Sequence, residues 1–131
     1  MVTKYFRENL IMSESKLRES ICFFASSLFE RGVTHGSTGN ISVRLNDNEI
    51  LVTPSGSSFG RLDPNEIVKI TKSGEFEGPL PPTKELPLHK AFYETRGLKS
   101  GAVVHLHSTH SVALSMIPGI DEDNVLPAYT P

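Results

Sequence analysis

The stretch ISVRLNDNEILVT, residues 41–53, decides what kind of fold this chain can form. Apolar side chains at positions 41, 43 and 45 alternate with polar ones, which is the period of a strand with one buried face. Asn46-Asp47-Asn48 has the composition of a turn, and residues 50–53 have the pattern of a returning strand. The sequence therefore predicts an antiparallel β-hairpin.

Helices and further strands are expected on both sides of this hairpin. Residues 13–32 predict a helix, because apolar side chains recur every three or four residues between a serine cap and Gly32. Downstream, the patterns predict a strand, a helix capped by Thr83, a buried strand and a short helix, over residues 67–70, 83–97, 102–107 and 109–116. This order predicts an α/β fold, with a mixed sheet and helices on its faces.

Composition bounds the class of protein. A chain of 131 residues is long enough for one core, and 13 basic against 15 acidic residues give a net charge of −2. That balance favours neither nucleic acid nor an anionic membrane as a partner. The single cysteine, Cys22, excludes an internal disulfide framework and is expected in the core. No apolar run has secretory or membrane-spanning character, so the expected compartment is the cytoplasm.

His105 and His107 are the most informative pair of side chains. They lie two residues apart at the end of the predicted strand 102–107, and alternate residues of a strand point to the same face. Two converging imidazoles are a typical start of a Zn²⁺ site. The alternative is an exposed strand face that carries two polar side chains.

Glu85 is a candidate third ligand or proton shuttle. It lies near the start of the helix that follows a proline-rich connector, where the helix dipole favours a carboxylate. A first-turn glutamate that only complements the dipole is the alternative. His89 is on the same face one turn later and is expected to be its structural neighbour, whereas His35 and His110 are expected to be solvated or hydrogen-bonded locally.

Three short segments have the composition of an anion site. Residues 36–40 and 55–58 combine glycines with hydroxyl and amide donors, so the backbone can approach a ligand closely. Thr83 and Lys84 add a hydroxyl and a positive charge next to Glu85. Each segment alone is also typical of an ordinary turn, and their combination with the histidine pair is what favours a phosphate site.

In this order and spacing, the motifs GSTGNIS (36–42), VTPSG (52–56), PTKE (82–85) and VVHLHS (103–108) resemble the class II aldolase/adducin family. The similarity extends from about Ser13 to Pro131. Within that family, the stretches LFERG (28–32), THGSTG (34–39), GRLD (60–63) and HLHSTHSV (105–112) most resemble the branch that decarboxylates 3-oxo-tetronate 4-phosphates. Sugar-phosphate aldolases and pentulose-phosphate epimerases are similar at a greater distance.

The resemblance implies a three-layer α/β/α fold with a mostly antiparallel sheet, assembled as a homotetramer. It implies one divalent metal, normally zinc, bound by the histidines at His105 and His107 with the acid/base glutamate at Glu85. It also implies that phosphate is bound at Gly39 and Asn40, Ser55 and Gly56, Thr83 and Lys84. The aldolases often have a pair of serines at the last of these positions, so Lys84 favours the decarboxylase branch.

The implied reaction is loss of CO₂ from a β-keto acid to give dihydroxyacetone phosphate. A metal stabilises the enediolate as a Lewis acid, and Glu85 manages the proton steps. A class II aldolase of the fuculose-phosphate type, or an epimerase, would use the same residues. A different class of function, an inactive adducin-like binding module, is disfavoured because a scaffold has no need for this set of side chains.

The chain departs from the family pattern at both ends. The family's third metal histidine lies beyond Pro131, so the expected domain over residues 13–131 is incomplete, and a truncated product without activity is an alternative. Residues 1–12 are expected to be an N-terminal extension, and the true start is either Met1 or Met12.

Overall fold

The strands form one antiparallel sheet in the computed structural model, which describes residues 13–119, 121 and 123. The predicted extension 1–12 lies outside the described residues. The sheet has five strands in the order β4-β3-β2-β1-β5. Their bounds are β1 Asn40–Arg44, β2 Ile50–Val52, β3 Val68–Ile70, β4 Phe76–Glu77 and β5 Ala102–His105. The predicted hairpin is confirmed as β1 and β2, and every pairing between the described strands is antiparallel.

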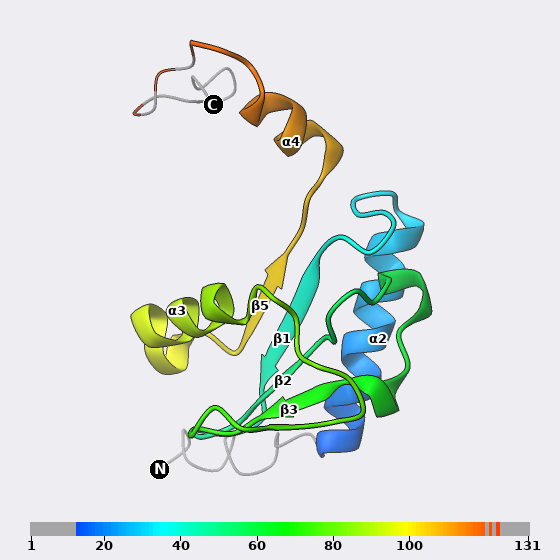
Figure 1. The fold of residues 1–131 in the computed structure, drawn as a ribbon, viewed down its shortest axis with the longest axis vertical. Helices are drawn as coiled ribbons and strands as arrows, with labels where there is room; N and C mark the ends of the chain where they lie inside the picture. Colours follow the sequence, from blue (N-terminus) through cyan, green and yellow to red (C-terminus); the bar gives the residue numbers. More distant parts are fainter. Residues whose placement is uncertain (1–12, 120, 122, 124–131) are drawn as a thin grey trace, which may run out of the picture.

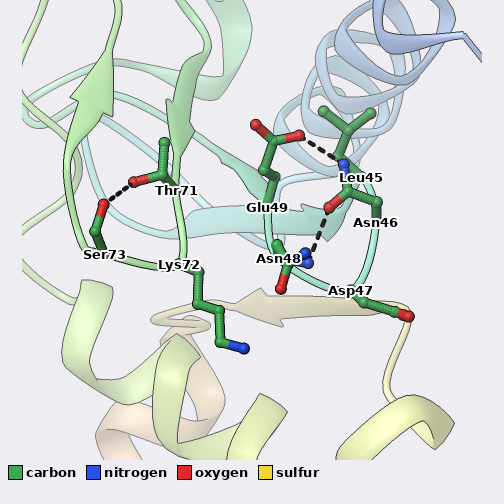
Figure 2. A pocket seen from close by; sticks show the side chains of 8 residues that line it. All are labelled: Leu45, Asn46, Asp47, Asn48, Glu49, Thr71, Lys72 and Ser73. Atoms are coloured by element: carbon green, nitrogen blue, oxygen red, sulfur yellow. Dashed lines mark hydrogen bonds between the residues drawn. The ribbon is translucent and has the colours of Figure 1, made fainter.

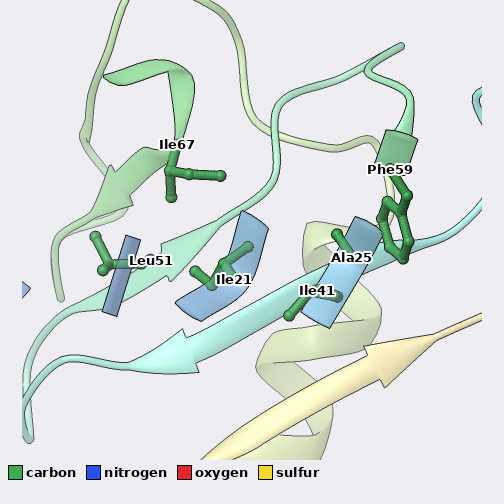
Figure 3. Close-up of a cluster of buried hydrophobic side chains, with 6 residues drawn as sticks. All are labelled: Ile21, Ala25, Ile41, Leu51, Phe59 and Ile67. Carbon is green, nitrogen blue, oxygen red and sulfur yellow. The ribbon is translucent and has the colours of Figure 1, made fainter. Parts of the chain in front are cut away.

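Helix α2 (Glu14–Glu30) covers one face of this sheet (Figure 1). It begins where predicted, since the Ser13 side chain accepts a hydrogen bond from the backbone N–H of Lys16 at 3.3 Å. Its inward side packs with two strands and the segment 59–67 into the main core (Figure 3). The buried members are Ile21, Ala25, Ile41, Leu51, Phe59 and Ile67. Burial of their apolar surface stabilises this layer.

Helix α3 (Leu86–Arg96) lies on the opposite face, which completes the α/β/α arrangement that was expected (Figure 1). Val52, Val68 and Ile70 form a second buried cluster there, with Leu86 packed against it. The expected Thr83 cap is wrong in detail, because the helix N-cap is Glu85. Thr83 instead accepts a hydrogen bond from the backbone N–H of Glu85 at 3.3 Å.

The predicted strand 102–107 is shorter and more exposed than expected. Strand β5 ends at His105, so His107 lies in the segment between the strand and helix α4 (Thr109–Ser115). Val103 is buried, but Val104 is 53% exposed. Val104 pairs with Ile41 and therefore faces the α2 side of the sheet, at a strand with one described neighbour. Helix α4 has no buried residue and stands away from the sheet (Figure 1).

Candidate active site

Three loops that are distant in sequence meet around one cavity of about 300 Å³. They are residues 37–40, which lead into the start of β1, residues 54–57 after β2 and residues 83–85 before α3, and His107 completes the lining. All six residues that the sequence singled out for phosphate line this cavity: Gly39, Asn40, Ser55, Gly56, Thr83 and Lys84. Glu85 lines it as well. The fold therefore gathers hydroxyl and amide donors, one lysine and one glutamate around a small polar space.

Strand pairing brings the first loop to the histidines. Asn40 is opposite His105 in the β1–β5 ladder, so both residues lie on the same face of the sheet. Gly39 has a φ of +84°, and a Cβ atom there would be 3.1 Å from the carbonyl oxygen of His105. This close approach requires glycine at position 39.

Backbone hydrogen bonds join the second and third loops. The N–H of Ser55 donates to the carbonyl of Pro81 at 2.9 Å, and the N–H of Thr83 donates to the carbonyl of Thr53 at 3.1 Å. Pro54 and Pro82 form an antiparallel bridge between these two contacts. Two loops separated by nearly thirty residues are thus held as one wall of the cavity.

The two candidate metal histidines are neighbours. The ring centroids of His105 and His107 are 4.7 Å apart. The Nδ1 atom of His105 is buried and has no hydrogen-bond partner, which is costly for a polar atom unless it binds a ligand. Within the part of the chain that the structure describes, no three His, Cys, Asp or Glu side chains form a metal-binding group. The structure therefore brings the histidine pair together without joining Glu85 to it as a third ligand.

His89 has a larger role than the sequence indicated. It is fully buried, its Nδ1 is 2.7 Å from the Ser42 hydroxyl, and its Nε2 is 2.5 Å from Asn40 Oδ1. The Ser42 hydroxyl is also 2.8 Å from that of Tyr93. Burial, with a smaller contribution from the neighbouring His105, lowers the pKa of His89 to about 4. The sequence contained two signals for this network. Asn40 and Ser42 are polar residues at alternate positions of a strand, and His89 and Tyr93 are four residues apart on a helix.

The remaining candidates lie where they were expected. His35 and His110 are exposed. Cys22 packs against the main core, and burial raises the pKa of its thiol to about 11. Neither observation adds a residue to the cavity.

A second, more open hollow lies at the other end of the sheet, between the turns at residues 45–49 and 71–73 (Figure 2). Its polar groups bond to one another, since the Asn46 amide donates to Glu49, the Asn48 N–H donates to Asn46, and the hydroxyls of Thr71 and Ser73 are 2.8 Å apart. Side chains that satisfy one another inside their own turns have less to offer a ligand. The cavity beside the histidines is the better candidate site.

Comparison with known proteins identifies relatives over most of the chain. Residues 19–131 match the class II aldolase and adducin N-terminal domain. The chain is 46% identical to a 3-oxo-tetronate 4-phosphate decarboxylase from Escherichia coli O6:H1, over 90% of this chain and 55% of that protein. It is 34% identical to L-fuculose phosphate aldolase from Escherichia coli K12, over 81% of this chain and 48% of the aldolase. The crystal structure of YgbL from Escherichia coli matches with a TM-score of 0.82 and 42% identity, over 92% of this chain and 57% of that one.

The chain spans a little over half the length of the decarboxylases it matches. None of the described helices combines the length and apolar character that crossing a bilayer requires.

Proposed function

The chain belongs to the class II aldolase and adducin N-terminal domain family. From this membership we propose that it acts as a carbon–carbon lyase. The reaction that we propose converts 3-oxo-tetronate 4-phosphate into dihydroxyacetone phosphate and CO₂. One observation carries the proposal: loops from three parts of the chain line one cavity beside a histidine pair. The higher identity to decarboxylases, 46% against 34% for the fuculose phosphate aldolase, favours decarboxylation.

The phosphate group of the substrate would bind at the loop end of the cavity. Lys84 supplies the positive charge, and Asn40, Ser55 and Thr83 supply neutral donors. Gly39 and Gly56, both with positive φ, allow the backbone to approach the phosphate oxygens. A dianion in a small cavity is stabilised by this mixture of one cation and several hydrogen-bond donors.

The histidine pair fits a divalent metal, for which we propose zinc. Imidazole nitrogen is a preferred zinc ligand, and the buried Nδ1 of His105 lacks any partner in the described part of the chain. His105 and His107 would hold the ion, with Glu85 as the proposed third protein ligand. When bound, the metal supplies Lewis-acid stabilisation of negative charge on the substrate oxygens.

Glu85 is the proposed acid/base group. In the proposed reaction the bond between C1 and C2 of the substrate breaks, and C1 leaves as CO₂. The electron pair of the broken bond stays on the substrate and moves toward the C3 carbonyl oxygen. A proton must then reach C2 to give dihydroxyacetone phosphate. Glu85 lines the cavity next to Lys84, so its carboxyl group can deliver that proton to substrate whose phosphate is bound nearby.

Product analysis tests the proposal. We expect the purified protein with Zn²⁺ to release CO₂ and dihydroxyacetone phosphate in equal amounts from 3-oxo-tetronate 4-phosphate. Cleavage of L-fuculose 1-phosphate to an aldehyde and dihydroxyacetone phosphate, without CO₂ from the keto acid, would assign the site to an aldolase instead. Conversion of a pentulose phosphate to its stereoisomer would assign it to an epimerase.

Two further expectations stay predictions. We propose residues 13–131 as one family domain, preceded by an extension, and a tetramer as the working assembly. Limited proteolysis with mass analysis would check the domain boundary, and light scattering would check the assembly.

A further inference from the structure

A continuous line of buried polar side chains runs from helix α3 to the cavity. It connects Tyr93, Ser42, His89 and Asn40 by hydrogen bonds of 2.8, 2.7 and 2.5 Å. Ser42 and His89 are fully buried, and Asn40 and Tyr93 are 5% and 8% exposed. Burying four polar side chains is costly unless each hydrogen bond is satisfied, so this line has a structural or functional reason.

The chemistry of Asn40, the last residue of the line, determines the direction of every hydrogen bond in it. The Oδ1 atom of Asn40 can only accept, so the Nε2 of His89 carries the proton and donates it. Complete burial favours the neutral imidazole, and its Nδ1 is therefore an acceptor. The Ser42 hydroxyl then donates to Nδ1 and accepts from the Tyr93 hydroxyl. His89 thus has one tautomer and one ring orientation.

Fixing the amide oxygen of Asn40 also fixes its amide nitrogen. With Oδ1 bonded to His89, the Nδ2 group makes no hydrogen bond to any other described residue, and Asn40 lines the cavity. An NH₂ group attracts an anion, whereas the amide oxygen in the same place would repel it. Rotation of the amide by 180° would exchange the two groups, and the His89 contact opposes that rotation.

We propose that His89 is a positioning residue that holds the Asn40 amide with its NH₂ group toward the phosphate of the substrate. The inference rests on the proposed function, since it takes the cavity to bind a sugar phosphate. It assigns to His89 an influence on anion affinity that acts through Asn40 without direct contact with the ligand. Ser42 and Tyr93 orient the His89 ring from its other side.

Two conservative variants separate positioning from general stability. His89→Gln places an amide donor near the position of Nε2, so the bond to Asn40 can persist. His89→Asn is shorter and places its amide near Nδ1, so it retains a partner for Ser42 and loses Asn40. Both variants remove the ring from the same buried place, and their stabilities are therefore a matched comparison.

The experiment is a titration with inorganic phosphate, followed by the ¹H–¹⁵N signals of the Asn40 side-chain amide, together with thermal unfolding of each variant. We expect His89→Asn to weaken phosphate binding on the order of 10-fold and His89→Gln to remain within about 3-fold of the wild-type affinity. Asn40→Asp, which points a carboxylate at the anion, should abolish phosphate binding.

Three results would overturn the inference in different ways. Wild-type phosphate affinity in His89→Asn would show that Asn40 needs no positioning, while leaving the proposed function intact. Equal loss of affinity in both His89 variants, in proportion to lost thermal stability, would reduce the network to a role in folding. No phosphate binding by the folded wild type would remove the proposed phosphate cavity, and the inference with it.

Discussion

Strand β1 buries opposite kinds of side chain on its two faces, apolar ones toward α2 and polar ones toward α3. From β1, Ile41 and Val43 pack into the apolar core that includes Ile21 and Ala25 of α2. Figure 3 shows Ile41 in this core. Asn40 and Ser42 alternate with them and bond to His89 on α3. On the α2 side of β1, burial of apolar surface stabilises the contact, and such burial tolerates small shifts. On the α3 side of β1, each hydrogen-bond donor must meet its acceptor. The period of the strand thus separates stability from site geometry.

The largest effect is expected from Glu85→Gln, which should lower turnover without lowering stability. The substitution removes the proposed proton carrier from an exposed position at the start of α3. Turnover should fall by about 10²- to 10⁴-fold, while the free energy of unfolding stays near wild type. Zinc content should fall by less than turnover, because His105 and His107 remain after the change of one proposed ligand. Steady-state assays of CO₂ release, zinc analysis and chemical unfolding measure the three quantities. Unchanged turnover would remove Glu85 from the mechanism.

On the other face, Ile21→Ala should act on stability alone. Ile21 is 1% exposed at the centre of the α2 core (Figure 3), so truncation leaves a cavity between α2 and the sheet. We expect a loss of about 2 to 5 kcal/mol in the free energy of unfolding. Phe23→Ala is the matched control on the same helix, since Phe23 is 70% exposed and its truncation should cost less than about 0.5 kcal/mol. Similar losses in both variants would contradict this picture of α2.

The pH dependence of stability should come from His89, which is buried between α3 and β1. The folded protein holds the pKa of His89 at about 4, against 6.5 for an unburied histidine. Between those values the unfolded chain binds a proton that the folded protein does not, so stability falls as pH drops from 6.5 to 4. The total loss is about 3 kcal/mol, and His89 contributes no pH dependence above this window.

Chemical unfolding across that pH range measures the effect, with His89→Gln as the control because glutamine does not titrate. The free energy of unfolding of the wild type, minus that of His89→Gln, should increase as the pH rises from 4 to 6.5. Parallel pH profiles would show that His89 titrates normally in the folded state.

The smallest of these effects is expected from Ser42→Ala. Loss of the hydroxyl leaves the Nδ1 of His89 and the hydroxyl of Tyr93 without their common partner in a buried place. The expected cost is about 1 to 3 kcal/mol, and phosphate affinity should weaken less than in His89→Asn. The same substitution at an exposed serine, Ser15→Ala, should change stability by less than about 0.5 kcal/mol, so equal losses would argue against a special role for the line.

Local patterns predicted the elements of this fold well and their ends less well. The alternation in residues 41–53 and the apolar stripe of residues 13–32 determined the hairpin and helix α2, because each signal repeats over several residues. Strand 102–107 was placed correctly, but its end at His105 and its exposure at Val104 depend on which neighbours cover it. A run of apolar residues does not contain that information.

The sequence by itself determined the chemistry available to this protein: imidazoles, a carboxylate, a lysine and glycine-rich loops with hydroxyl and amide donors. Only the tertiary structure decided how these groups meet. It set Asn40 opposite His105, joined the second and third loops through Pro54 and Pro82, and bonded His89 to a residue 49 positions away. The physical reason is that strand register and buried hydrogen bonds are selected by the packing of distant segments, which no local pattern encodes.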